Sequence, residues 1–400
     1  MLDKMPLDRG ASLIIERLYS SGYEANIVGG AVRNHILGIP VSDIDITTSA
    51  LPEEVCRIFS DLRVIETGIK HGTVTVLIDG TPYELTTYRT DGSYLDNRHP
   101  ESVSFTASLS EDLARRDFTV NAIAYNPRDG YTDLFGGISD IKDRVIRAVG
   151  NPEVRFGEDA LRILRAIRFA SALGFSVEAH TALAVRKCAP LLANVSRERI
   201  FLEWTKLLLG SGAHAVLSSY SDVISTVVGE LSKLRLPEPR LFNLATPTVR
   251  ELSLFYLSCP DPVSSFNSAM TALRADNRRR KNGISALEII DGCNLRSRSE
   301  LRLFVYRYSL DSVATAVELA YTVGKINAEE YANAKSALNG ANIHSLADLS
   351  VGGADIMPLG LSGREIGSLL DTLAVAVIEE RCENTRDSLI CYAKKIINAG

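Results

Sequence analysis

Residues 27–50, IVGGAVRNHILGIPVSDIDITTSA, place a glycine pair and an arginine shortly before two aspartates that alternate with isoleucines. The apolar start is typical of a strand that ends in a turn at Gly29 and Gly30. The segment after the turn predicts a short helix that stops near Gly38. Glycine lets a backbone approach a phosphate closely, and the start of a helix offers free N–H groups to anions. This stretch therefore predicts an α/β unit with a phosphate site at one end.

The two aspartates, Asp43 and Asp45, lie in the segment SDIDIT, whose alternation predicts a strand. Side chains two residues apart on a strand point to the same face, with backbones about 6–7 Å apart. Converging carboxylates suit Mg²⁺, and paired ions can activate an attacking hydroxyl and stabilise a leaving phosphate. Taken alone, D-x-D is also typical of an exposed polar strand face. The upstream glycine turn, with Arg33 one turn into the helix, favours a metal and nucleotide site.

The bulk properties set broad limits. A chain of 400 residues is too long for one compact core and predicts two to four domains. Its net charge of −5 argues mildly against a nucleic-acid binder, although phosphate contacts need only a local basic patch. The six scattered cysteines include no C-x-x-C pair, which favours a reduced, cytoplasmic chain without a zinc cluster. No signal peptide or membrane-length apolar run is visible, so we expect no membrane partner.

Strand and helix signals are mixed only as far as about residue 146. Strands are predicted in GTVTVLID and YELTTYR, and a helix in SALPEEVCRIF with Ser49 as its cap. From Glu158 onward the apolar spacing is helical almost everywhere. We therefore predict an α+β chain, with an α/β head followed by a long all-helical remainder.

Three motifs now identify a family. The segments GGAVRN…SDIDI, ARRDFTVNAIAYN and FGEDALRILRAIRFA resemble the class II tRNA nucleotidyltransferase/poly(A) polymerase family, most closely the bacterial CCA-adding enzymes. The resemblance covers about residues 25–210, and a looser pattern recurs in MPLGLSGREIGSLLDTL. It implies a polymerase-β-like nucleotidyltransferase head (1–147), a helical neck for base recognition (148–212), a helical body (213–290) and a helical, tRNA-binding tail (291–400).

The resemblance also implies roles for single residues. Asp43 and Asp45 would bind the catalytic Mg²⁺, and Gly30 and Arg33 would contact the nucleotide phosphates. The RRDF segment places Arg116 on the incoming nucleotide, with Asp117 orienting Arg116 or supporting the metal site. Glu84 in YELTTYR is our candidate for a third catalytic carboxylate. One departure is Asn34, which stands where the family usually has Asp.

Residues 158–171 predict a helix with one charged face. At about 100° per residue, Asp159, Arg162, Arg165 and Arg168 fall opposite the main apolar stripe, with Leu161 and Phe169 as exceptions on the charged side. A solvated face with ion pairs is the alternative interpretation. A carboxylate accepts from the amino group of cytosine or adenine, and a guanidinium donates to the acceptor beside it. We therefore expect Asp159 and Arg162 to read the base, while Arg165 and Arg168, by resemblance, bind nucleotide or hold that pair.

The predicted activity is that of a CCA-adding tRNA nucleotidyltransferase, which adds C, C and A to the tRNA 3′ end from CTP and ATP and releases pyrophosphate. A polar loop within residues 89–105 is associated in this family with addition of the final A. The basic run at 274–281 suits an RNA backbone or a solvated helix end equally. A poly(A) polymerase, a CC-only or A-only enzyme and a non-catalytic RNA-binding module remain alternatives, and no protein partner is predicted.

Overall fold

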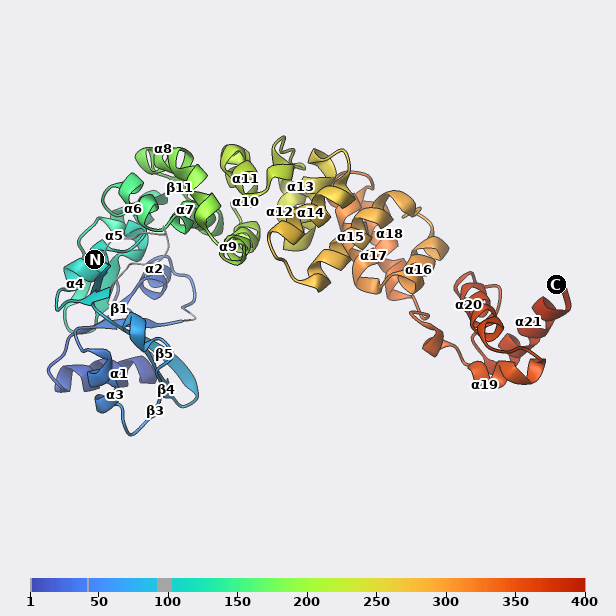
Figure 1. The fold of residues 1–400 in the computed structure, drawn as a ribbon, viewed down its shortest axis with the longest axis horizontal. Helices are drawn as coiled ribbons and strands as arrows, with labels where there is room; N and C mark the ends of the chain where they lie inside the picture. Colours follow the sequence, from blue (N-terminus) through green and yellow to red (C-terminus); the bar gives the residue numbers. More distant parts are fainter. Residues whose placement is uncertain (1, 42, 92–102, 400) are drawn as a thin grey trace. The chain divides into compact units, whose positions relative to one another are not determined.

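The computed structural model describes residues 2–41, 43–91 and 103–399 of the chain (Figure 1). Contacts divide the chain into two compact units, Met1–Val227 and Val228–Gly400. The first unit combines a mixed sheet with helices, whereas the described residues of the second form helices and connecting turns. The expected α+β head and helical remainder are confirmed. The finer division of the chain at residues 147, 212 and 290 stays a prediction.

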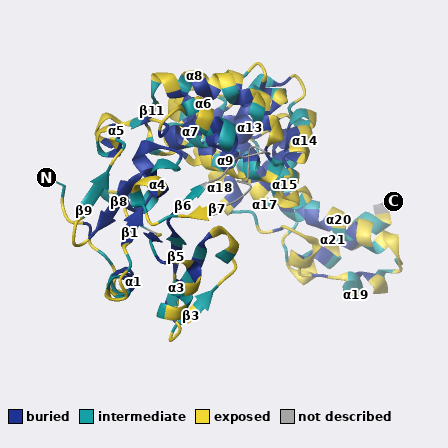
Figure 2. Cartoon of the chain, turned by 60° about the vertical axis from the view of Figure 1, so that its left-hand side comes forward, coloured by how far each residue is buried: buried dark blue, intermediate teal, exposed yellow. Residues whose placement is uncertain are grey.

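Among the described residues, seven strands form a sheet in the order β3-β4-β5-β2-β1-β8-β9. All neighbours run antiparallel except β2 and β5, which are parallel. The central strands β1 and β8 are buried at every position, as Figure 2 shows in dark blue. The strands of this sheet are β1 (Ala25–Val28), β2 (Asp45–Thr48), β3 (Arg63–Ile65), β4 (Thr73–Ile78), β5 (Thr81–Thr87), β8 (Ile123–Asn126) and β9 (Gly130–Asp133). Two small pairs are β6 (Arg89–Asp91) with β7 (Val103–Phe105) and β10 (Val145–Ile146) with β11 (Ser176–Val177).

Helices of the first unit cover this sheet and then pack on one another. Helix α1 packs against β1 and β5, α2 against β1 and β8, and α7 against α9 and α10. The bounds are α1 (Arg9–Ser20), α2 (Gly30–Ile36), α3 (Pro52–Ile58), α4 (Leu109–Ala114), α5 (Gly137–Asp143), α6 (Pro152–Glu158), α7 (Leu161–Leu173), α8 (Ala179–Cys188), α9 (Arg197–Leu209), α10 (Ala213–Ser219) and α11 (Ser221–Val227). Ser49 does not cap α3: its hydroxyl accepts from the N–H of Glu24, and Glu54 caps the helix through the N–H of Leu51.

The second unit is built from helices. Its bounds are α12 (Pro239–Leu244), α13 (Pro247–Ser258), α14 (Pro262–Ala272), α15 (Asn277–Gly292), α16 (Arg298–Arg307), α17 (Leu310–Thr322), α18 (Ala328–Asn339), α19 (Gly353–Ile356), α20 (Arg364–Ile378) and α21 (Arg386–Ala399). Helix α17 packs on α15 and α18, while Leu373 of α20 and Leu389 of α21 belong to a separate apolar cluster. Across the part of the chain that the structure describes, no helix combines the length and the apolar character needed to cross a membrane.

Candidate active site

The predicted glycine turn lies between β1 and α2. Gly29 caps α2 with a φ of 70°, a conformation that residues with a side chain rarely adopt. A Cβ atom on Gly29 would lie 3.4 Å from Nη1 of Arg116, and one on Gly30 would lie 3.6 Å from Nη2 of Arg33. The turn therefore faces two guanidinium groups at close range, which is the charge that a triphosphate requires.

Arg33 is buried and is held by amide groups. Its Nη1 donates to Oδ1 of Asn121 at 2.6 Å, and its Nε and Nη2 donate to Oδ1 of Asn34 at 3.2 and 2.9 Å. Burial, helped by the nearby charge of Arg168, lowers the pKa of Arg33 to about 10. Asn34 thus offers a neutral oxygen to Arg33 at the position where the family usually places a carboxylate.

The two aspartates occupy different backbone environments. Strand β2 begins at Asp45, so Asp43 precedes the strand, and the expectation of one strand carrying both residues was wrong. Both residues are exposed. In the parallel pairing of β2 with β5, Asp45 lies opposite Glu84. Partial burial, and then the charges of Glu84 and Asp43, raise the pKa of Asp45, while Arg116 acts in the opposite direction. Three carboxylates therefore contribute to one negatively charged region beside Arg116.

The carboxylates of this region could hold a divalent metal ion. Within residues 2–41, 43–91 and 103–399, no three His, Cys, Asp or Glu side chains are placed to hold one ion. Glu84 raises the pKa of Asp45 through its charge, and its role as a third catalytic carboxylate stays a prediction. Mutual repulsion among carboxylates that raises a pKa is relieved by a cation. The chemistry of Asp43 and Asp45 fits a divalent ion held by two carboxylates.

Arg116 is oriented by a residue that the sequence pattern did not indicate. Its Nη2 donates to Oδ2 of Asp112 at 3.2 Å, and its Nε is buried without a hydrogen-bond partner in the described chain. Asp117 instead accepts from Nε and Nη2 of Arg165 at 2.8 and 2.6 Å. The expectation that Asp117 orients Arg116 thus gives way to two separate pairs, Asp112 with Arg116 and Asp117 with Arg165.

The predicted helix over residues 158–171 is interrupted. Helix α6 ends at Glu158, α7 begins at Leu161, and Asp159 between them has an extended φ of −132°. Its Oδ1 accepts from the N–H of Leu161 at 3.0 Å, and its Oδ2 accepts from Nη2 of Arg199 at 2.8 Å. The helical-wheel position expected for Asp159 was therefore wrong, because this side chain leaves the helix to bond the backbone and α9.

Arg162 lies within α7, as expected, and its guanidinium is bonded by protein acceptors. It is 8% exposed, and its Nη1 donates to Oε2 of Glu158 at 2.6 Å while its Nη2 donates to the carbonyl of Arg115 at 3.2 Å. The guanidinium bonded to Asp159 belongs to Arg199 of α9. The Nη1 of Arg199 is buried and has no hydrogen-bond partner within the described residues. The carboxylate of Asp159, which is an acceptor, therefore lies beside a buried N–H donor of Arg199 that has no partner within the described residues.

The remaining arginines converge on Phe169. The guanidinium carbons of Arg33, Arg165 and Arg168 lie 5.3, 5.3 and 3.5 Å from the centroid of its ring. Nε of Arg168 donates to Oε2 of buried Glu203 at 2.9 Å. The alternative of a solvated helix face is therefore wrong: Phe169 and Leu161 are buried, and the arginines pair inward. Cation–π contacts and two carboxylates offset the repulsion among three neighbouring cations.

Two further regions were candidates for function on the basis of the sequence. The loop segment 92–100, expected to serve A addition, lies outside the described residues. In the basic run, Arg279 pairs with fully buried Glu251 at 2.8 Å, so part of that run is structural.

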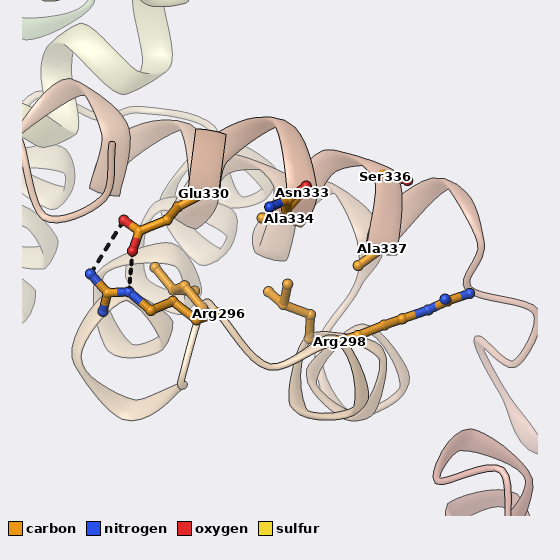
Figure 3. A pocket seen from close by; sticks show the side chains of 9 residues that line it. Arg296, Arg298, Glu330, Asn333, Ala334, Ser336 and Ala337 are labelled. Carbon is orange, nitrogen blue, oxygen red and sulfur yellow. Dashed lines mark hydrogen bonds and ion pairs between the residues drawn. The ribbon is translucent and has the colours of Figure 1, made fainter. Parts of the chain in front are cut away.

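Between α16 and α18 lies a pocket of about 290 Å³ (Figure 3). There Arg296 is paired with Glu330 through Nε at 2.5 Å, and Arg298 extends away from Glu330.

Comparisons with known proteins agree with this geometry. Family models match three parts of the chain: residues 25–147 match the poly A polymerase head domain, residues 174–220 match a family described as a probable RNA and SrmB binding site of polymerase A, and residues 253–393 match tRNA nucleotidyltransferase domain 2. A CCA-adding enzyme of Enterococcus faecalis is 35% identical over 395 residues, which cover 96% of this chain and 95% of that protein.

Solved structures give the same result. The structure of a Bacillus stearothermophilus CCA-adding enzyme in complex with CTP has a TM-score of 0.81 and 32% identity, and the match covers 98% of this chain and 97% of that one. A Thermotoga maritima CCA-adding enzyme complexed with tRNA shares the fold, with a TM-score of 0.67 at 20% identity. Head, glycine turn and carboxylate pair together define a nucleotidyltransferase. With relatives at this identity over nearly its whole length, the chain belongs to the bacterial CCA-adding enzymes.

Proposed function

We propose that this nucleotidyltransferase completes tRNA 3′ ends by adding C, C and A from CTP and ATP. The oxygen of the RNA 3′-hydroxyl forms a bond to the α-phosphorus. The bond from that phosphorus to the bridging oxygen breaks, pyrophosphate leaves with the electron pair, and the hydroxyl proton passes to solvent. The observation that carries the proposal is the placement of Arg116 and Arg33 against the glycine turn, with the Asp45 carboxylate within electrostatic reach of Arg116.

The nucleotide phosphates would bind at Gly30, Arg33 and Arg116. The buried Nε of Arg116 has no hydrogen-bond partner in the described residues, and a buried donor left unpaired costs about 1–3 kcal/mol. A phosphate oxygen at this position would remove that cost. The partners of Arg33 are neutral amides, so its positive charge is also available to an anion.

Asp43 and Asp45 would hold the divalent ion, which we propose to be Mg²⁺. When bound, the ion would activate the attacking hydroxyl and stabilise charge on the leaving phosphate. Glu84 would act on Asp45 through its charge, which favours binding of a cation by raising the local negative potential. The family and the six free cysteines support a cytoplasmic location, which we also propose.

Base selection would rest on Asp159. Its carboxylate accepts from the amino group of cytosine or adenine, whereas uracil and guanine present a carbonyl there. Arg199 fixes one carboxylate oxygen and the N–H of Leu161 fixes the other, so the acceptor has a defined orientation. We propose that Arg162 contributes to base recognition, either by releasing Glu158 and donating to the base or by holding Glu158 in place. Arg165 and Arg168 would stabilise this region through their contacts with the ring of Phe169.

The test is direct. A tRNA transcript ending in its discriminator base is offered CTP, ATP or both with MgCl₂, and the 3′ ends are sequenced. We expect CC with CTP alone and CCA with both nucleotides. Runs of A would indicate a poly(A) polymerase, and CC as the final product of both nucleotides would indicate a CC-only enzyme. RNA binding without extension, unchanged in Asp45→Ala, would indicate a non-catalytic module.

A further inference from the structure

A fully buried carboxylate, Asp112, lies beside the candidate nucleotide site without being part of it. Its Oδ1 accepts from Nε and Nη2 of Arg115 at 3.0 and 2.7 Å. Its Oδ2 accepts from Nη2 of Arg116 at 3.2 Å and from the hydroxyl of Thr47 at 3.2 Å, a hydroxyl that also faces the carbonyl of Thr86 at 3.1 Å and shares its proton between the two acceptors. Burial alone would raise the pKa of Asp112, but the two arginines reverse this and hold it below its ordinary value. Asp112 is therefore a charged group whose acceptors are occupied by protein donors.

The contact with Thr47 connects Asp112 to the strand of the carboxylate pair. Thr47 lies two residues after Asp45 on β2, so both side chains point to the same face of the sheet. The parallel register sets Asp45 opposite Glu84 and Thr47 opposite Thr86. Asp112 thus accepts from a residue of β2 that lies two positions after Asp45, the carboxylate that would bind the metal.

The contact with Arg116 fixes the direction of a phosphate-binding group. One nitrogen, Nη2, is held by Asp112, while Nη1 faces Gly29 and Nε has no partner in the described residues. Helix α4 carries Asp112 and is docked by Leu113, which clusters with Val28 immediately before the glycine turn. Asp112 therefore connects the glycine turn, Arg116 and β2 through separate contacts.

We propose that Asp112 is a positioning residue that sets the distance between the triphosphate-binding Arg116 and the metal-binding Asp45. The inference rests on the proposed function and deepens it. Asp112 holds the guanidinium against the turn and ties it to β2 through Thr47, so that phosphate and metal ligands keep a fixed register. It does not touch the substrate, because its oxygens already accept from three protein side chains.

The experiment measures the affinity of the full chain for CTP and ATP in MgCl₂ by calorimetry, separately from tRNA extension. Replacing the carboxylate in Asp112→Asn should lower the affinity for both nucleotides about tenfold. The two nucleotides should be affected equally, because the lost charge-assisted hydrogen bond orients a group that binds the phosphates and not the base. In an Arg116→Met background the same change should alter affinity less than about twofold, since the group that it orients is gone. Equal effects in both backgrounds, or an unchanged affinity, would overturn the proposal.

Two further variants keep the test decisive if Asp112→Asn does not fold. Thr47→Val removes the hydroxyl at similar volume and should weaken both nucleotides at least about threefold, whereas Thr47→Ser keeps the hydroxyl and should match wild type. A folded Thr47→Val protein with wild-type affinity would contradict the proposal. Glu251→Gln is the matched control, because Glu251 is also a fully buried carboxylate paired with an arginine, in the second unit. It should lower thermal stability without changing nucleotide affinity. Absent tRNA extension by wild type would count against the proposed function alone.

Discussion

Replacing Asp159 by asparagine should change the base preference of the enzyme rather than abolish transfer. Both carboxylate oxygens accept hydrogen bonds within the protein, from the N–H of Leu161 and from Nη2 of Arg199. An amide keeps the shape but offers only one acceptor oxygen, and its NH₂ group donates. In the variant, therefore, one of the two internal donors loses its partner, and one edge of the reading group changes from acceptor to donor.

The size of the effect follows from these contacts. The lost internal hydrogen bond should destabilise the fold by about 1–2 kcal/mol. Facing an amide N–H, the amino group of cytosine loses its acceptor and the carbonyl of uracil gains a donor. At about 2 kcal/mol for each change, the ratio of UTP to CTP incorporation should rise by up to about 10³-fold.

The assay is single-nucleotide extension of a tRNA lacking CCA, with each of the four triphosphates in turn. Asp159→Ala is the matched variant, because it removes the acceptor without adding a donor. It should lose preference for CTP and gain no rate with UTP. A folded Asp159→Asn protein whose UTP:CTP ratio stays within about threefold of wild type would refute base reading by this carboxylate.

Four other changes have defined outcomes. Asn34→Asp should give Arg33 an ionised partner and stabilise the protein by about 1–2 kcal/mol at pH 7 in urea unfolding. Since the pKa of Arg33 is lowered to about 10 in the folded state, wild type should gain stability as pH rises above 10, and the variant should lose most of that gain. Chelation by EDTA should stop transfer until MgCl₂ is restored, and Asp45→Ala should stop it without lowering the melting temperature, because the raised pKa of Asp45 means that its charge does not favour the fold. Glu203→Gln should leave Arg168 without a charged partner and cost about 3 kcal/mol on urea unfolding; a cost near zero would show that the ring of Phe169 suffices.

Local patterns predicted the elements that carry the head. The glycine turn lies where the sequence placed it, and the first five residues of YELTTYR lie within β5. The start of β2 could not be predicted from the sequence, because the alternation of polar and apolar residues continues through Asp43, although pairing with β1 and β5 begins only at Asp45. Alternation reports which way side chains point and not where hydrogen bonding to a neighbour starts.

Partners distant in the chain explain the remaining differences. The apolar period runs through residues 158–171 without a break, but Asp159 is drawn out of the helix by Leu161 and by Arg199, which lies 40 residues later. Asp112 and Thr47 are 65 residues apart, so no local spacing could link them. An aspartate in the first turn of a helix usually serves the helix dipole at the surface, and nothing local distinguished Asp112 from that case.

The break between α6 and α7 has a consequence for engineering. A side chain within a continuous helix can be redirected only by moving the helix, whereas one at a joint turns with its own backbone torsions. Asp159 can therefore be re-aimed by changes at residues 159–160 while α7 and its packed arginines stay in place. Libraries that seek acceptance of modified or enlarged bases should randomise this two-residue joint before any position on the helices beside it.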